Sequence, residues 1–166
     1  TGADRVRLDK SVIPELTFGF HLSARYKNFD FYANFAGEGN AWWLILQNAR
    51  PDLNAPAELL DNRYTQGSMT SKYPWIPQTG GEVSGLRSTF WLQNAAFLRL
   101  KTIEFSYSLP EKLISKANVD RFRIYFNGSN LLTFSDVKWY DPEGSNEGGT
   151  FYPQSKIFNL GVQITF

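Results

Sequence analysis

The sequence contains no cysteine, and this absence excludes three classes of site at once. Thiolate catalysis, disulfide bridges and cysteine-ligated metal ions all need that side chain. A single histidine leaves too little imidazole for a histidine-rich metal site or for most catalytic triads. No nucleophile, base and orienting group stand at recognisable spacing, and we therefore expect that the chain is not an enzyme and has no cofactor.

Neither a charge excess nor a long apolar segment is present. The 17 Lys and Arg residues stand against 16 Asp and Glu, and a formal net charge of +1 does not favour nucleic acid as a partner. The longest apolar run, 41–46, is far shorter than the roughly 20 residues of a membrane-spanning helix. Spanning helices are therefore excluded. Spanning strands are not, because they carry apolar residues only at alternate positions.

Aromatic residues are abundant, with 14 Phe, 8 Tyr and 5 Trp, and many of them fall at every second position. The clearest alternation is in 156–166, where apolar side chains are separated by small or polar ones. Period two predicts a strand with one apolar face. The apolar members of this segment are Phe158, Leu160, Val162, Ile164 and Phe166.

The same alternation predicts four further strands, at 16–27, 29–36, 97–109 and 121–130. Phe and Tyr near strand ends, such as Phe18 with Tyr26 and Phe97 with Tyr107, fit the aromatic girdles of membrane barrels. We therefore predict an all-β chain with an antiparallel sheet.

The connections between these strands differ in length. Segments 27–28 and 110–119 are short, whereas 37–95 and 131–155 are long and rich in Gly, Pro and Asn. In an up-and-down sheet both short turns fall at one end and both long loops at the other, which is typical of an outer-membrane β-barrel. Because a sheet in hydrocarbon must close, five strands are a piece of a larger transmembrane barrel.

Several ordered motifs carry a family resemblance. They are FLRLK at 97–101, LP at 109–110, NLLT at 130–133, YDPE at 140–143, YP at 152–153 and the closing alternation to Phe166, preceded by FGF at 18–20 and YKNFD at 26–30. Together they resemble the C-terminal part of SusC/RagA-type TonB-dependent outer-membrane transporters of Bacteroidetes.

The resemblance implies a 22-strand barrel with a plug in its lumen, of which this chain would supply the last five strands. It implies import of glycans or peptides across the bacterial outer membrane with a SusD-like surface lipoprotein, driven by a TonB complex that contacts N-terminal regions outside this sequence. Loops 37–95 and 131–155 would be extracellular, and turns 27–28 and 110–119 periplasmic. The alternating residues from Phe158 to Phe166 would be the signal for the barrel assembly machinery.

Aromatic residues of the long loops are the candidate contacts for a substrate or for the lipoprotein lid. The alternative is that they fold the loops on themselves. The candidates are Trp42, Trp43, Tyr73, Trp75, Trp139 and Tyr140.

Two other sites are weighed and set aside. Asp141, Glu143 and Glu147 offer oxygen ligands for Ca²⁺, but their spacing does not match an EF-hand loop and their neighbours suit an ordinary turn, so we expect no metal site. His21 falls on the polar face of its strand, where a solvated or hydrogen-bonded imidazole is the default.

A second function remains open at this point. The alternation also fits a water-soluble β-sandwich, such as a carbohydrate-binding module whose tryptophan-rich loops form the binding face. A strand that ends on the aromatic residue Phe166 favours the importer over this module.

Overall fold

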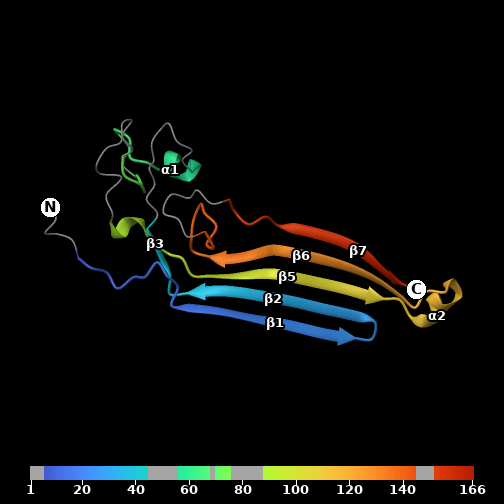
Figure 1. Ribbon diagram of the computed structural model, residues 1–166. Coiled ribbons are helices and arrows are strands. Elements are labelled where there is room, and N and C mark those ends of the chain that lie inside the picture. The colour runs from blue at the N-terminus through green and yellow to red at the C-terminus, as the bar shows by residue number, and fades with distance from the viewer. Residues whose placement is uncertain (1–5, 45–55, 68–69, 76–87, 145–151) are drawn as a thin grey trace.

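The computed structural model describes residues 6–44, 56–67, 70–75, 88–144 and 152–166. Its main feature is a five-stranded antiparallel sheet in which chain neighbours pair in the order β1-β2-β5-β6-β7 (Figure 1). A two-stranded sheet, β3-β4, lies within the connection between β2 and β5. The strands are β1 (Leu16–Tyr26), β2 (Phe29–Gly39), β3 (Trp42–Leu44), β4 (Leu92–Asn94), β5 (Phe97–Ser108), β6 (Arg121–Ser135) and β7 (Ile157–Thr165).

The helical elements are short. They are α1 (Ala57–Asp61), α2 (Glu111–Ile114) and the 3-10 turns η2 (Thr89–Trp91) and η3 (Ser115–Ala117). Pro110 stands immediately before α2, as its fixed φ favours at a helix start. Asn118 follows η3 with φ of 52°, a left-handed conformation that asparagine tolerates and that ends the turn.

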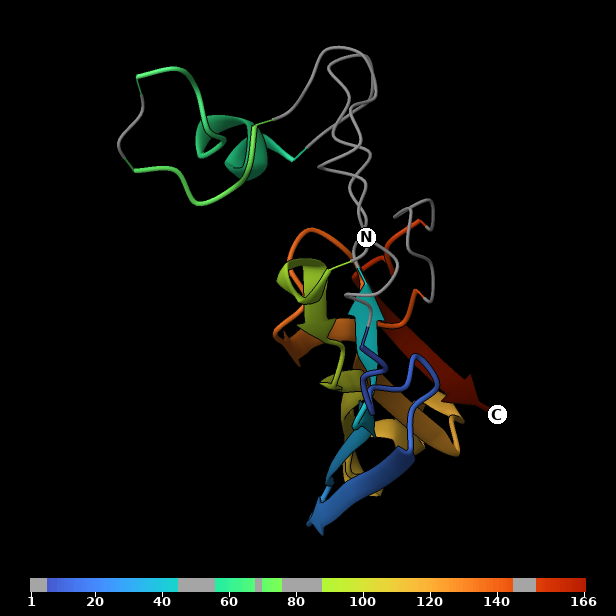
Figure 2. The ribbon, with the colours of Figure 1, turned by 90° about the vertical axis from the view of Figure 1, so that its left-hand side faces the viewer.

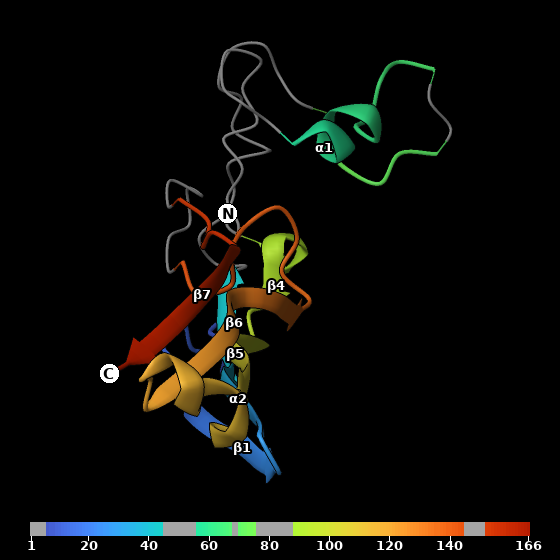
Figure 3. The ribbon, with the colours of Figure 1, turned by 90° about the vertical axis from the view of Figure 1, so that its right-hand side faces the viewer.

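Connections of different kinds lie at opposite ends of the sheet. The two-residue turn between β1 and β2 lies at the same end as α2, whereas α1 and β3 lie at the other end (Figure 1). Seen along the strands from the loop end, the segment that precedes β1 stands in front (Figure 2). Seen from the opposite end, α2 stands in front of the sheet (Figure 3). The antiparallel sheet therefore follows the pattern that the alternation predicts.

The two long connections contain more regular structure than the sequence suggests. Residues 37–39, expected in a loop, continue β2, and residues 131–135 continue β6. Gly37 permits this extension, because a Cβ there would lie 2.5 Å from the carbonyl oxygen of Phe97 on the paired strand. The loop prediction was wrong for these residues, because backbone pairing with β5 outweighs their weak strand pattern.

A register shift in β5 changes which face its side chains occupy. Between Leu100 and Thr102 the pairing skips Lys101 on the β2 side, and Asn130 of β6 has a positive φ of 55° beside the same point. One extra residue moves every following side chain to the other face. Phe97 therefore pairs with Glu38 on the polar side and is 5% exposed, so its expected place in an aromatic girdle with Tyr107 was wrong.

Candidate functional site

One face of the five-stranded sheet is apolar and exposed along its whole width. Aromatic rings from neighbouring strands pack side by side on it: the centroids of Phe20 and Phe35 are 4.8 Å apart, and those of Phe31 and Phe105 are also 4.8 Å apart. Leu160 on β7 is 79% exposed. A continuous apolar surface of this extent indicates an apolar neighbour rather than water. Its exposed members include Leu16, Phe18, Phe20, Leu22, Phe29, Phe105, Ile124, Leu132, Phe134, Phe158, Leu160, Val162 and Ile164.

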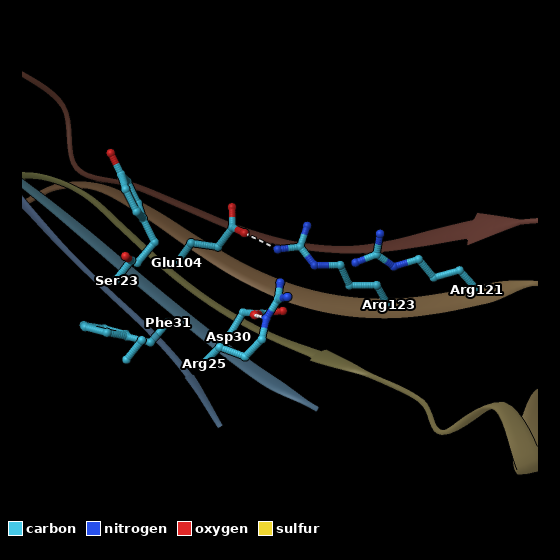
Figure 4. A pocket seen from close by; sticks show the side chains of 9 residues that line it. Ser23, Arg25, Asp30, Phe31, Glu104, Arg121 and Arg123 are labelled. Carbon is cyan, nitrogen blue, oxygen red and sulfur yellow. Dashed lines mark hydrogen bonds and ion pairs between the residues drawn. The ribbon is translucent and has the colours of Figure 1, made fainter. Parts of the chain in front are cut away.

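The opposite face is polar and carries charged pairs. Arg25 Nε lies 2.5 Å from Asp30 Oδ1, between β1 and β2. Arg123 on β6 donates from Nη2 to Glu104 Oε1 at 2.5 Å and to Ser106 Oγ at 2.8 Å, both on β5. A hollow of about 450 Å³ that four strands share is lined by Arg25, Asp30, Glu104 and Arg123, among others (Figure 4). The sheet thus separates an apolar surface from a charged one by the alternation of its strands alone.

A buried arginine anchors the loop after β6 to the sheet. Arg99 is 2% exposed, and its guanidinium donates to Thr133 Oγ1 at 2.9 Å, Glu143 Oε2 at 2.5 Å and Asp141 Oδ1 at 2.6 Å. Lys101 forms a further ion pair with Glu143. The two carboxylates considered for calcium are therefore engaged by cationic side chains, and Glu147, the third, lies outside the described residues.

The pKa of Asp141 reflects this setting. Burial alone would raise it, but the hydrogen bond from Arg99 and those from the backbone amides of Glu143 and Gln154 hold the pKa below its ordinary value of 3.8. Burial raises the pKa of the neighbouring Tyr140 hydroxyl. The loop is thus fixed by an ionised carboxylate at neutral pH.

Two apolar clusters fold the loop end on itself. Ala41, Trp43 and Ala95 form the first, and Leu59, Tyr73 and Trp91 form the second. Trp139, on the loop after β6, packs against both, with its ring centroid 5.6 Å from that of Tyr73. The rings of this region are therefore the core of the loop end.

Glu58 of α1 forms hydrogen bonds with residues in and around the second cluster. Its carboxylate accepts hydrogen bonds from Lys72 Nζ at 2.8 Å, Trp139 Nε1 at 3.1 Å and the Tyr73 hydroxyl at 3.3 Å. The bonds from Lys72 and Trp139 lower the pKa of Glu58 to about 2. Residues far apart in the sequence are thus joined through one ionised group.

The six aromatic candidates fall into different environments. Trp43 and Tyr73 are each 8% exposed, and Trp139 and Tyr140 are half-buried against the first cluster. These four side chains therefore belong to the two apolar clusters or pack against them. Trp42 is half-buried beneath Lys10, whose Nζ lies 3.6 Å from the ring centroid.

Trp75, at 59% exposed, is the candidate most open to a ligand or partner. The proposed assembly residues Phe158, Leu160, Val162, Ile164 and Phe166 are all exposed, the first four of them on β7.

Sequence reasoning missed two hubs, Arg99 and Glu58. Arg99 belongs to the FLRLK motif, and the two acids that pair with it, Asp141 and Glu143, belong to the YDPE motif. An arginine in one ordered motif and two acids in another could therefore have indicated this ion pair. Nothing in the sequence distinguishes Glu58 from other acids, because its partners come from two distant segments, 72–73 and the loop that holds Trp139.

Comparison with known proteins connects this geometry with a family. No family model matches the sequence. TonB-dependent receptor P26 of Formosa agariphila is 33% identical over 94% of this chain and 17% of its own length. TonB-dependent receptor P3 of the same organism is 29% identical over 92% of this chain and 16% of its own length.

Solved structures give the same answer. The chain superposes on the RagAB peptide importer in its closed-closed state with a TM-score of 0.74 and 35% identity, covering 96% of this chain and 18% of that one. A structure of the RagAB peptide transporter gives a TM-score of 0.75 with 34% identity over 97% of this chain. The chain is a RagA-like segment of a TonB-dependent receptor.

The RagA-like segment spans less than a fifth of the length of the relatives it matches. TonB-dependent receptors are transporters of the bacterial outer membrane and not enzymes. The family resemblance of the ordered motifs and the antiparallel sheet are thereby confirmed. Among the described residues, no helix has both the length and the apolar character needed to cross a membrane.

Proposed function

We propose that this chain forms the last five strands of the barrel wall of an outer-membrane TonB-dependent nutrient importer. The observation that carries the proposal is the exposed apolar face opposite a charged one, on strands of 9 to 15 residues. A tilted strand needs about 9–11 residues to cross a bilayer. The apolar face would contact lipid, and the polar face would line the interior of a 22-strand barrel.

The two ends of the sheet would then lie on opposite sides of the membrane. The turn at 27–28 and the segment 110–119 would be periplasmic, and the expected loops 37–95 and 131–155 extracellular. Short periplasmic turns and long outer loops are the usual arrangement in outer-membrane barrels. The contacts of Arg99 and Glu58 at the loop end support the extracellular placement of the long loops. Such contacts offset the conformational entropy that a long loop loses when it becomes ordered.

Peptides are the substrate class that we favour over glycans, because the matched solved structures are named as peptide importers. The complete importer would also contain the remainder of the barrel and its plug, and it would work with the TonB complex and a SusD-like lipoprotein. Trp75 is the candidate contact for the lipoprotein or the substrate, and β7 would carry the signal for the assembly machinery.

The carbohydrate-binding module gains no support. A water-soluble sandwich buries the apolar face of each sheet against a second sheet, whereas most large apolar side chains on this face are exposed in the described part of the chain.

The two sides of the membrane can be tested by labelling. The 166 residues contain no cysteine, so Trp75→Cys and Lys112→Cys can be introduced separately into the intact receptor. On whole cells, a membrane-impermeant maleimide should label the variant at position 75 and spare the variant at 112 until the outer membrane is permeabilised. The receptor without either substitution is the control for cysteines elsewhere. Equal labelling at both positions in intact cells would overturn the proposed orientation.

A further inference from the structure

The polar face carries more basic than acidic side chains near its short-turn end. The hollow of about 450 Å³ adjoins a second one of about 790 Å³, and both are lined by Arg25, Asp30 and Arg121. The further basic residues that line them are Lys27, Lys112 and Arg123, and the further acidic residues are Glu104, Glu111 and Asp120.

Two of the arginines already have a carboxylate partner. Arg25 pairs with Asp30, and Arg123 pairs with Glu104. Arg121 makes no ion pair with any residue that the structure describes, although its side chain lines both hollows. Figure 4 shows Arg121 and Arg123 one after the other on β6, with their side chains on the same side of the strand. Arg121 therefore lines the hollow without an ion pair to a described residue, next to Arg123, which has one.

Arg123 has donors to spare. Its Nη2 serves both Glu104 and Ser106, while its Nε is buried and has no acceptor among the described residues. A buried donor left without an acceptor is costly, and native structures satisfy nearly all such groups. The described residues thus leave the guanidinium of Arg123 only partly satisfied, with Glu104 and Ser106 as its acceptors.

We propose that Arg121 and Arg123 receive a carboxylate from an acidic side chain in the part of the receptor outside this chain. A carboxylate has two acceptor oxygens that match the guanidinium fork, and residues two apart on a strand lie on one face at the spacing that lets both forks reach one group. Most of the relatives' length lies outside this chain, and the acidic side chain would come from the corresponding part of the receptor. The inference rests on the proposed function in one respect, that the polar face looks into the receptor.

Photo-crosslinking in the intact receptor tests this site. Arg121→p-benzoylphenylalanine should give a crosslinked peptide from outside the 166 residues, with Asp or Glu next to the modified position. Adducts confined to neighbours on β1, β2, β5 or β7, adducts with a segment that has no nearby acid, or the absence of any protein adduct would each overturn the proposal. Leu160→p-benzoylphenylalanine, on the apolar face, is the control and should react with lipid. Protein adducts at position 160 would instead refute the membrane placement, so the two failures are distinguishable.

Charge reversal supplies the second measurement. Arg121→Glu should lower the thermal midpoint of the intact receptor, and reversing the crosslinked acid to Arg in the same molecule should restore at least half of the loss. Lys116→Glu, an exposed cation outside the lining of both hollows, should leave the midpoint unchanged. Loss without restoration would overturn the pairing, as would an equal loss from Arg121→Glu and Lys116→Glu.

Discussion

A single charge placed on β7 should distinguish a lipid-facing surface from a water-facing one. Leu160 lies near the middle of β7, pairs in register with Phe126 and is 79% exposed. Its neighbours on the same face of β7 are Phe158 and Val162, so an arginine there would have no counter-ion within its strand. In a bilayer, Leu160→Arg should therefore cost roughly 2–4 kcal/mol, the usual cost of a cation near the midplane on the lipid face of a barrel.

The matched control is Asn159→Arg, one residue earlier and on the opposite face, where the paired residue is Asn127. It should cost less than about 0.5 kcal/mol, as surface substitutions usually do. Urea unfolding of the intact receptor in lipid vesicles measures both values. If the two variants lose the same stability, the apolar face does not contact lipid and the reasoning fails.

Three further predictions concern the loop anchor and the extended strand. Arg99→Met removes the cation from a buried carboxylate pair and should weaken the local structure by roughly 3–5 kcal/mol. Lys101→Met, at a more exposed ion pair, should cost less than about 1 kcal/mol. Hydrogen exchange of the amides that donate to Asp141 measures both effects, and equal effects would contradict the role of Arg99 as the anchor. Because the pKa of Asp141 is lowered in the folded state, its contribution to stability is complete above its ordinary value of 3.8 and should be lost as the pH falls from there through the lowered pKa. The protection factors of these amides, which are corrected for the intrinsic exchange rate, should therefore fall only in that acidic window. Gly37→Ala should reduce assembly of the receptor because the new Cβ meets a backbone oxygen at 2.5 Å, whereas Gly39→Ala, whose nearest contact is at 3.4 Å, should be tolerated in the same heat-modifiability assay.

Strand positions were predictable because the apolar face imposes a strict period of two. In β1 the alternation from Leu16 to Tyr26 continues without interruption, and the strand has these bounds. The pattern failed at Lys101, where one extra residue reverses the alternation and moves Phe97 and Arg99 to the polar side. A bulge of this kind depends on pairing with both neighbouring strands, and local composition does not encode it.

The loop end was less predictable, since its order comes from contacts between distant segments. Tryptophan enrichment indicated that the loops matter, but it could not distinguish the buried Trp43 from the exposed Trp75. The Glu58 hub joins residues about 80 positions apart, as in its bond to Trp139. Such contacts are decided by tertiary packing, which periodicity does not report.

The most direct test of the account is a nitroxide scan along β7, from position 157 to 165, in the intact receptor reconstituted in lipid vesicles. If β7 is part of a membrane wall, the accessibility of the labels should alternate with a period of two. Labels at 158, 160, 162 and 164 should be relaxed by oxygen, which concentrates in the bilayer, and labels between them should be less accessible to it. Uniform accessibility to a water-soluble nickel chelate along the whole strand would contradict a membrane wall with one lipid-facing surface.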